Sequence, residues 1–208
     1  MMPPMRGRPP GIRPDIAFIV DIRRENRALH LLYKALFELS VDRGDFVSRL
    51  FSRRRPPAAS ANTGVKELFD AYETVSADRG VFTENLSLIR SRLLEMHRIA
   101  LTPEDLASIE SLYDAFHSRG PTINYRQGDL VGPAFSTLMA NEDIFGGERS
   151  FLAGEESFRY VKNLHERNLI VPLVGDFAGP HTLRRVGEFL REHDETCVSF
   201  TDRTSRSI

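Results

Sequence analysis

Two short, continuous apolar runs stand out from the otherwise mixed pattern of hydrophobic and polar positions. Residues 16–22 (IAFIVDI) and residues 169–174 (LIVPLV) are rich in β-branched side chains and are bounded by charged or turn-forming residues. Runs of this length are typical of strands that are buried on both faces of a parallel sheet. We therefore predict two buried strands, and residues 197–201 are a candidate third strand.

Between and after these runs, apolar residues recur at helical spacing. The strongest helix prediction is 102–118, which opens on Thr102 as the N-cap with Pro103 at the first helical position and stops at Gly120-Pro121. Strands alternating with helices indicate an α/β fold, here an incomplete doubly wound, Rossmann-like sheet. The complete set of predicted helices is 26–40, 45–51, 65–75, 79–99, 102–118, a short 135–140, 155–167 and 182–193.

The segment RRRPPAASANTG, residues 53–64, interrupts this alternation with basic, proline and small residues. Three helix patterns follow it before the next strand, and we interpret residues 56–120 as a helical insertion in a single α/β domain, residues 15–208. Residues 1–14 are rich in proline, arginine and glycine and lack an apolar segment, which is typical of a disordered leader rather than a secretory signal.

The junction LIVPLVGDFAGPHTLRRVG, residues 169–187, predicts a ligand site. In open α/β sheets ligands bind outside the carboxyl ends of the strands; Gly175 lets the backbone leave the strand steeply, and Asp176 follows it. Asp21 holds the matching position after the first strand, where an acid commonly accepts hydrogen bonds from ribose hydroxyls. The alternatives are that Asp176 caps its turn and that Asp21 pairs with Arg23 or Arg24.

Composition narrows the choice of function. A net charge of -1 argues against nucleic acid as a partner, and the basic cluster at residues 53–55 is short and has no interleaved aromatic residue. The six histidines have no ligand spacing, which argues against a metal site. One cysteine, Cys197, cannot form an internal disulfide, and no apolar run approaches the roughly 20 residues needed to span a bilayer. We therefore expect a cytoplasmic protein without a membrane partner.

The stretches AFIVDIRREN (17–26), LLYKALFELSVDRGDFVSRLFSR (31–53) and RSFLAGEESFRYVKNLHERNLIVPLVGDFAGPHTLRRVG (149–187) resemble an uncharacterised family of bacterial proteins with a fold like that of class I S-adenosylmethionine-dependent methyltransferases. The resemblance runs from about residue 12 to about residue 193. It implies S-adenosylmethionine as a small-molecule cofactor, Asp21 as the acid that binds its ribose, and Asp176 near the transfer site.

The chain departs from that family at both ends. MMPPMRGRPPG stands where the family has a glycine-rich turn similar to GVGPEQN, and CVSFTDRTSRSI stands where it continues into another strand. We therefore expect either a fragment of a longer family member or a gene with displaced ends, with weak cofactor binding and a tendency to associate. The function expected first is a methyltransferase-like protein that is inactive in this form; the alternative is a non-catalytic module that binds a partner protein through the helical insertion.

Overall fold

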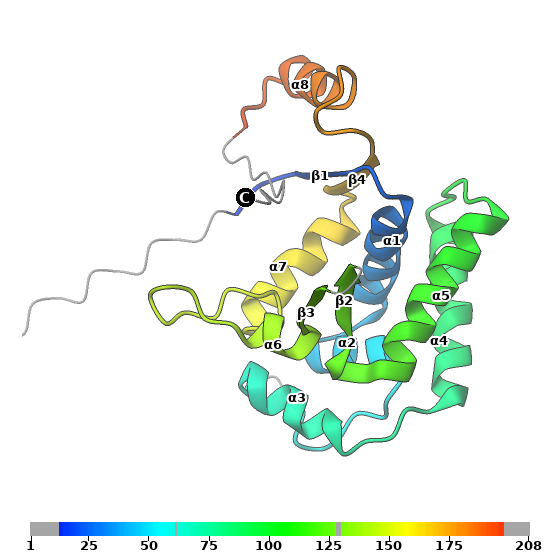
Figure 1. The fold of residues 1–208 in the computed structure, drawn as a ribbon, viewed down its shortest axis with the longest axis vertical. Helices are drawn as coiled ribbons and strands as arrows, with labels where there is room; N and C mark the ends of the chain where they lie inside the picture. The colour runs from blue at the N-terminus through cyan, green and yellow to red at the C-terminus, as the bar shows by residue number, and fades with distance from the viewer. Residues whose placement is uncertain (1–12, 61, 128–129, 198–208) are drawn as a thin grey trace, which may run out of the picture.

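A computed structural model describes residues 13–60, 62–127 and 130–197; the predicted leader, apart from residues 13 and 14, and residues 198–201 of the candidate third strand lie outside the described residues. The fold is mixed α/β, with many helices and a two-stranded parallel sheet (Figure 1). The elements in chain order are β1 (Ala17–Asp21), α1 (Arg24–Leu39), α2 (Arg43–Phe51), α3 (Val65–Glu73), α4 (Arg79–Ser91), a π-helical turn η1 (Arg92–Met96), α5 (Pro103–Arg119), a 3-10 turn η2 (Gly120–Thr122), β2 (Asn124–Gln127), β3 (Leu130–Ala134), α6 (Phe135–Ala140), α7 (Glu155–Glu166), β4 (Ile170–Val174) and α8 (Thr182–Glu192).

The helices form one hydrophobic core around aromatic side chains. Phe37 of α1 is 1% exposed and stacks on Phe158 and His165 of α7, with ring centroids 5.2 and 4.7 Å apart. Tyr113 of α5 stacks on Phe82 of α4 at 4.7 Å. Helices α3, α4 and α5, which we expected as an insertion, contribute to this same core together with α1, α2 and α7. They therefore form part of the main body of the protein.

Helix α5 begins and ends at the capping residues predicted from its sequence. The Thr102 hydroxyl accepts a hydrogen bond from the Asp105 amide, and the Asp105 carboxylate accepts one from the Thr102 amide, which completes a capping box. The helix ends at Gly120, whose φ of 57° lies in the left-handed region that favours glycine.

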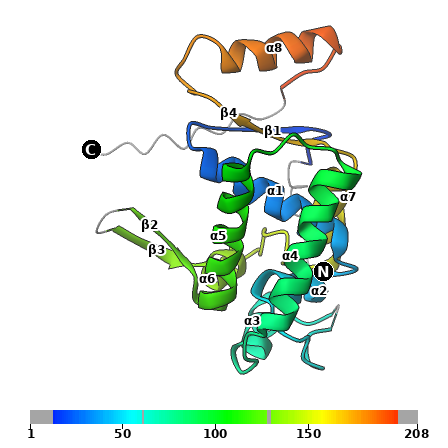
Figure 2. The ribbon, with the colours of Figure 1, turned by 90° about the vertical axis from the view of Figure 1, so that its right-hand side faces the viewer.

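The sheet lies between this helical body and α8 (Figure 2). β1 and β4 pair in parallel, as predicted, with Ala17 opposite Ile170 and Asp21 opposite Val174. The prediction that both strands are buried on both faces was wrong. All five residues of β1 are only half-buried, and Val174 of β4 is exposed. The face of the sheet away from the helical body is covered by a single helix, α8, and no residue of α8 is itself buried. This cover therefore shields the strands only in part.

The two edges of this sheet differ. The Ala17 amide donates a hydrogen bond to the Leu169 carbonyl, and the Gly175 amide donates one to the Asp21 carbonyl. The backbone groups of every second residue of β4 therefore point toward β1. Those of the residues between them, including Pro172, point toward the outer edge of the sheet. Proline has no N–H group to offer a further strand, and this edge is where sheets tolerate it. Within the part of the chain that the structure describes, the outer edge of β1 also pairs with no strand.

Residues 120–150 contain more structure than the predicted loop. β2 and β3 form an antiparallel hairpin with a register irregularity, and the predicted short helix is present as α6. Figure 2 shows this hairpin projecting from the body near α6. A second projection, the connection between α6 and α7, extends away from the body in Figure 1.

Candidate functional site

The carboxyl ends of β1 and β4 bring the predicted site residues to one edge of the sheet. Asp21 is in register with Val174, and the Gly175 amide donates a 3.0 Å hydrogen bond to the Asp21 carbonyl. Asp21, the last residue of β1, and the turn that contains Asp176 therefore lie at the same end of the sheet, as parallel pairing requires. The two acids come from opposite ends of the chain, and only the sheet places them together.

The Asp21 carboxylate is already saturated with donors. One oxygen accepts from the Arg23 amide at 2.8 Å and from Arg23 Nε at 3.2 Å, and the other accepts from Arg23 Nη2 at 3.1 Å and Asn26 Nδ2 at 3.2 Å. These hydrogen bonds, chiefly those of the Arg23 side chain, lower the pKa of Asp21. Four donors match the roughly four acceptor positions of a carboxylate. Of the alternatives that the sequence left open, the pairing with Arg23 is present.

Asp176 closes its own turn. Its carboxylate accepts a 2.9 Å hydrogen bond from the Ala178 amide, and its carbonyl accepts one from the Gly179 amide at 3.2 Å. This is the local side-chain-to-backbone bonding by which aspartate stabilises turns. The turn ends where α8 begins at Thr182, as the predicted helix 182–193 requires.

Gly175 is required by the close approach of α8. A Cβ atom at this position would collide with the Thr182 hydroxyl and lie 3.0 Å from both Thr182 Cβ and Thr182 Cγ2. The φ of Gly175 lies outside the left-handed region, so the constraint is space rather than backbone conformation. Gly175 therefore lets the first turn of α8 pack against the end of β4.

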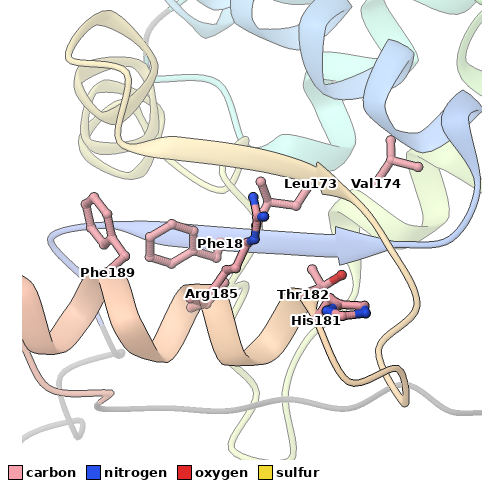
Figure 3. A pocket seen from close by; sticks show the side chains of 8 residues that line it. Phe18, Leu173, Val174, His181, Thr182, Arg185 and Phe189 are labelled. Atoms are coloured by element: carbon pink, nitrogen blue, oxygen red, sulfur yellow. The ribbon is translucent and has the colours of Figure 1, made fainter.

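A groove runs between the sheet and α8, with a volume of about 420 Å³. Its apolar wall includes Phe18 and Phe189, whose rings meet edge to face with centroids 5.4 Å apart. Figure 3 shows Arg185 extending from α8 into this groove, between the aromatic pair and the end that carries His181 and Thr182. A pocket of this size falls within the range of small-molecule sites, roughly 300–1,000 Å³.

Asp21 does not line this groove, and neither does Asp176. Side chains alternate between the faces of a strand, so Asp21 points to the face opposite Phe18. The structure thus brings the two acids to the carboxyl end of the sheet but places neither of them in the groove between the sheet and α8. The groove residues Arg185 and His181 were not among the predicted site residues. A signal for Arg185 exists in the sequence, since it lies four residues before Phe189 and so on the same side of α8.

Two of the histidines, His165 and His97, have structural roles. His165 is buried against Phe37, and burial lowers its pKa to about 3, so it is neutral in the folded protein. His97 bonds to Glu38 at 2.7 Å. In residues 13–60, 62–127 and 130–197, no group of three or more His, Cys, Asp or Glu side chains could hold a metal ion.

A family model described as a domain of unknown function (DUF7790) matches residues 12–197. The chain belongs to this family. The matched range contains β1, β4 and α8, so every element of the candidate site lies within the family domain. Comparison with curated proteins returned no match, and comparison with solved structures returned none either. Across the described residues, no helix has the length and apolar character needed to cross a bilayer.

Proposed function

We propose that this protein is a methyltransferase-like domain that binds S-adenosylmethionine at the carboxyl edge of β1 and β4. The observation that carries the proposal is the parallel register of Asp21 with Val174, which sets the acid at the end of β1 beside the glycine-bearing turn after β4, at the end of the sheet where α/β proteins bind ligands. The resemblance of residues 17–26 and 149–187 to methyltransferase-like proteins supports the identity of the cofactor.

The donors around Asp21 set a condition on this binding. A ribose diol needs two free acceptor positions on the carboxylate, and in the observed conformation Arg23 and Asn26 take all four. The side chain of Arg23 is about half exposed, so its displacement into solvent costs little compared with moving a buried group. Under this proposal the ribose competes with Arg23 for Asp21.

Titration calorimetry with S-adenosylmethionine and with S-adenosylhomocysteine tests the proposal. Replacing Asp21→Ala removes charged hydrogen bonds and is expected to weaken binding by about 1–3 kcal/mol. Arg23→Ala removes the competitor and is expected to strengthen binding. Asp15→Ala, a neighbouring exposed acid outside the edge, serves as the matched control and should leave the affinity unchanged. Absence of heat with both ligands at millimolar concentration would refute the proposal.

A second candidate function, binding to a partner protein, is favoured by the loop between α6 and α7. Ile144 and Phe145 are 93% and 75% exposed, more than the exposed leucines of α4 and η1 in the helical region where we expected such a surface. Asp143 fixes the loop beneath them, because its carboxylate accepts hydrogen bonds from the Phe145 and Gly147 amides, both at 2.9 Å. A preordered loop that displays apolar side chains loses little entropy on binding.

Photo-crosslinking tests this second function. A photoreactive phenylalanine analogue at Phe145 is expected to give one discrete adduct in cells. The same analogue at Leu88, which is 37% exposed on α4, is the control and should give none. Equal labelling at both positions, or no adduct at Phe145, would argue against a docking role for the loop.

A further inference from the structure

The groove between α8 and the sheet has the features of a second ligand site, independent of the proposed cofactor. Five of its eight lining residues are apolar; the remaining three are His181, Thr182 and Arg185, and none is acidic. Among the residues that the structure describes, no carboxylate pairs with Arg185. A cation without a counter-ion is thus placed beside an apolar wall.

The two ends of the groove differ in chemistry. Phe18 and Phe189 meet edge to face at one end and form an aromatic wall, and His193 stacks on the Phe189 ring with centroids 4.1 Å apart. At the other end lies the first turn of α8, whose N-cap residue, His181, makes no side-chain capping bond. The amide groups at a helix N-terminus favour an anion. Arg185 lies between these two ends and points into the groove (Figure 3).

We propose that this groove binds a small monoanion with a flat apolar body, an aromatic carboxylate in its simplest form. The apolar body would pack on Phe18 and Phe189, and the carboxylate would accept hydrogen bonds from the Arg185 guanidinium. Guanidinium and carboxylate groups match in geometry and form charge-assisted hydrogen bonds. A cation of the same size would face Arg185 without a compensating acid.

A matched pair of ligands tests the charge requirement. Naphthoate and the corresponding naphthamide share shape and differ in charge, and fluorescence reports their binding without interference because the chain has no tryptophan. We expect saturable naphthoate binding that is at least about tenfold tighter than naphthamide binding, as a charged hydrogen bond implies. Equal affinity for the two ligands, or no saturable binding up to millimolar concentration, would overturn the proposal.

Variants of α8 locate the site. Arg185→Gln is expected to remove the preference for naphthoate, whereas Arg184→Gln, an exposed neighbour that does not line the groove, should preserve it. Phe189→Ala should weaken both ligands, and a thermal melt of each variant confirms that it is folded. Asp21→Ala should leave naphthoate binding unchanged, so this result is separate from the success or failure of the S-adenosylmethionine proposal. An equal loss in the Arg184→Gln and Arg185→Gln variants would refute the assignment.

Discussion

The helical body and the layer formed by β1, β4 and α8 are packed very differently. In the body, Leu32, Leu36 and Ile89 are fully buried, and aromatic side chains interlock from α1 to α7. Among the described residues, the core cluster includes none from β1, β4 or α8. The same chain thus combines a densely packed scaffold with a thin layer that covers one side of it.

This difference in packing assigns most of the folding stability to the helical body and the candidate binding sites to the layer. Complete burial of large side chains supplies most of the hydrophobic free energy of folding, so the helical body determines the free energy of unfolding. The layer has a groove, an arginine without a paired acid and a sheet edge with acid-bearing turns. Elements with few buried contacts open at low free-energy cost, and ligand-binding regions are commonly drawn from them.

The largest expected effect comes from removing an aromatic ring in each region. Phe37→Ala in the body is expected to cost about 3–5 kcal/mol of unfolding free energy, because it leaves a cavity among Phe46, Phe158 and His165. Phe18→Ala in the layer removes a half-buried ring and should cost only about 1–2 kcal/mol. Denaturant titration of both variants measures the two values, and similar costs would contradict the comparison.

Acid is expected to destabilise the body through His165. Its folded pKa of about 3 lies below the ordinary value of 6.5, so the unfolded chain binds a proton that the folded protein excludes. Stability should therefore fall as pH drops below about 6.5, by up to about 1.4 kcal/mol per pH unit from this residue. His165→Phe should flatten the decrease between about pH 7 and pH 5. His30, whose pKa is also lowered by burial, would retain part of the slope; an unchanged slope would exclude His165 as the cause.

A smaller effect is expected where α8 meets the sheet. Gly175→Ala introduces a Cβ against Thr182 and should cost about 1–3 kcal/mol, as overpacking does. Thr182→Ala removes the colliding hydroxyl, so the double variant should recover most of the loss. A double-mutant cycle measures this coupling, and strictly additive effects would show that the two residues do not collide.

The smallest expected effect on stability concerns the outer edge of β4. Pro172→Val restores an N–H group there and should change the unfolding free energy by less than about 0.5 kcal/mol. It should nevertheless increase self-association, because an unpaired edge can pair with another chain. Pro172→Lys restores the same N–H group but adds a charge and should remain monomeric. Light scattering compares the two variants, and equal association would show that Pro172 does not protect the edge.

The sequence predicted helix and strand positions well where local signals were strong. Thr102, Pro103 and Gly120 mark the ends of α5 through capping chemistry, which depends on neighbouring residues alone. The β2–β3 hairpin was missed because Gly132 and Pro133 within β3 are typical of loops. The burial of β1 was overestimated because an apolar run does not reveal how many neighbouring strands cover it.

The candidate site was predicted only in part, for a similar reason. Asp21 and Asp176 lie at one sheet edge as expected, since parallel pairing of the two strands suffices to place them there. That Arg23 and Asn26 together saturate Asp21 depends on side-chain conformations, and the sequence offered only the pairing with Arg23 or Arg24, as one alternative. The groove depends on the distance between α8 and the sheet, a tertiary property that no local pattern encodes.

Amide hydrogen exchange of the free protein tests the division into body and layer most directly. Central amides of α1 are expected to exchange only through global unfolding, and amides of α8 and β1 at least about a hundredfold faster through local opening. Amides in α8 and β1 that are protected as strongly as those of α1 would contradict the account.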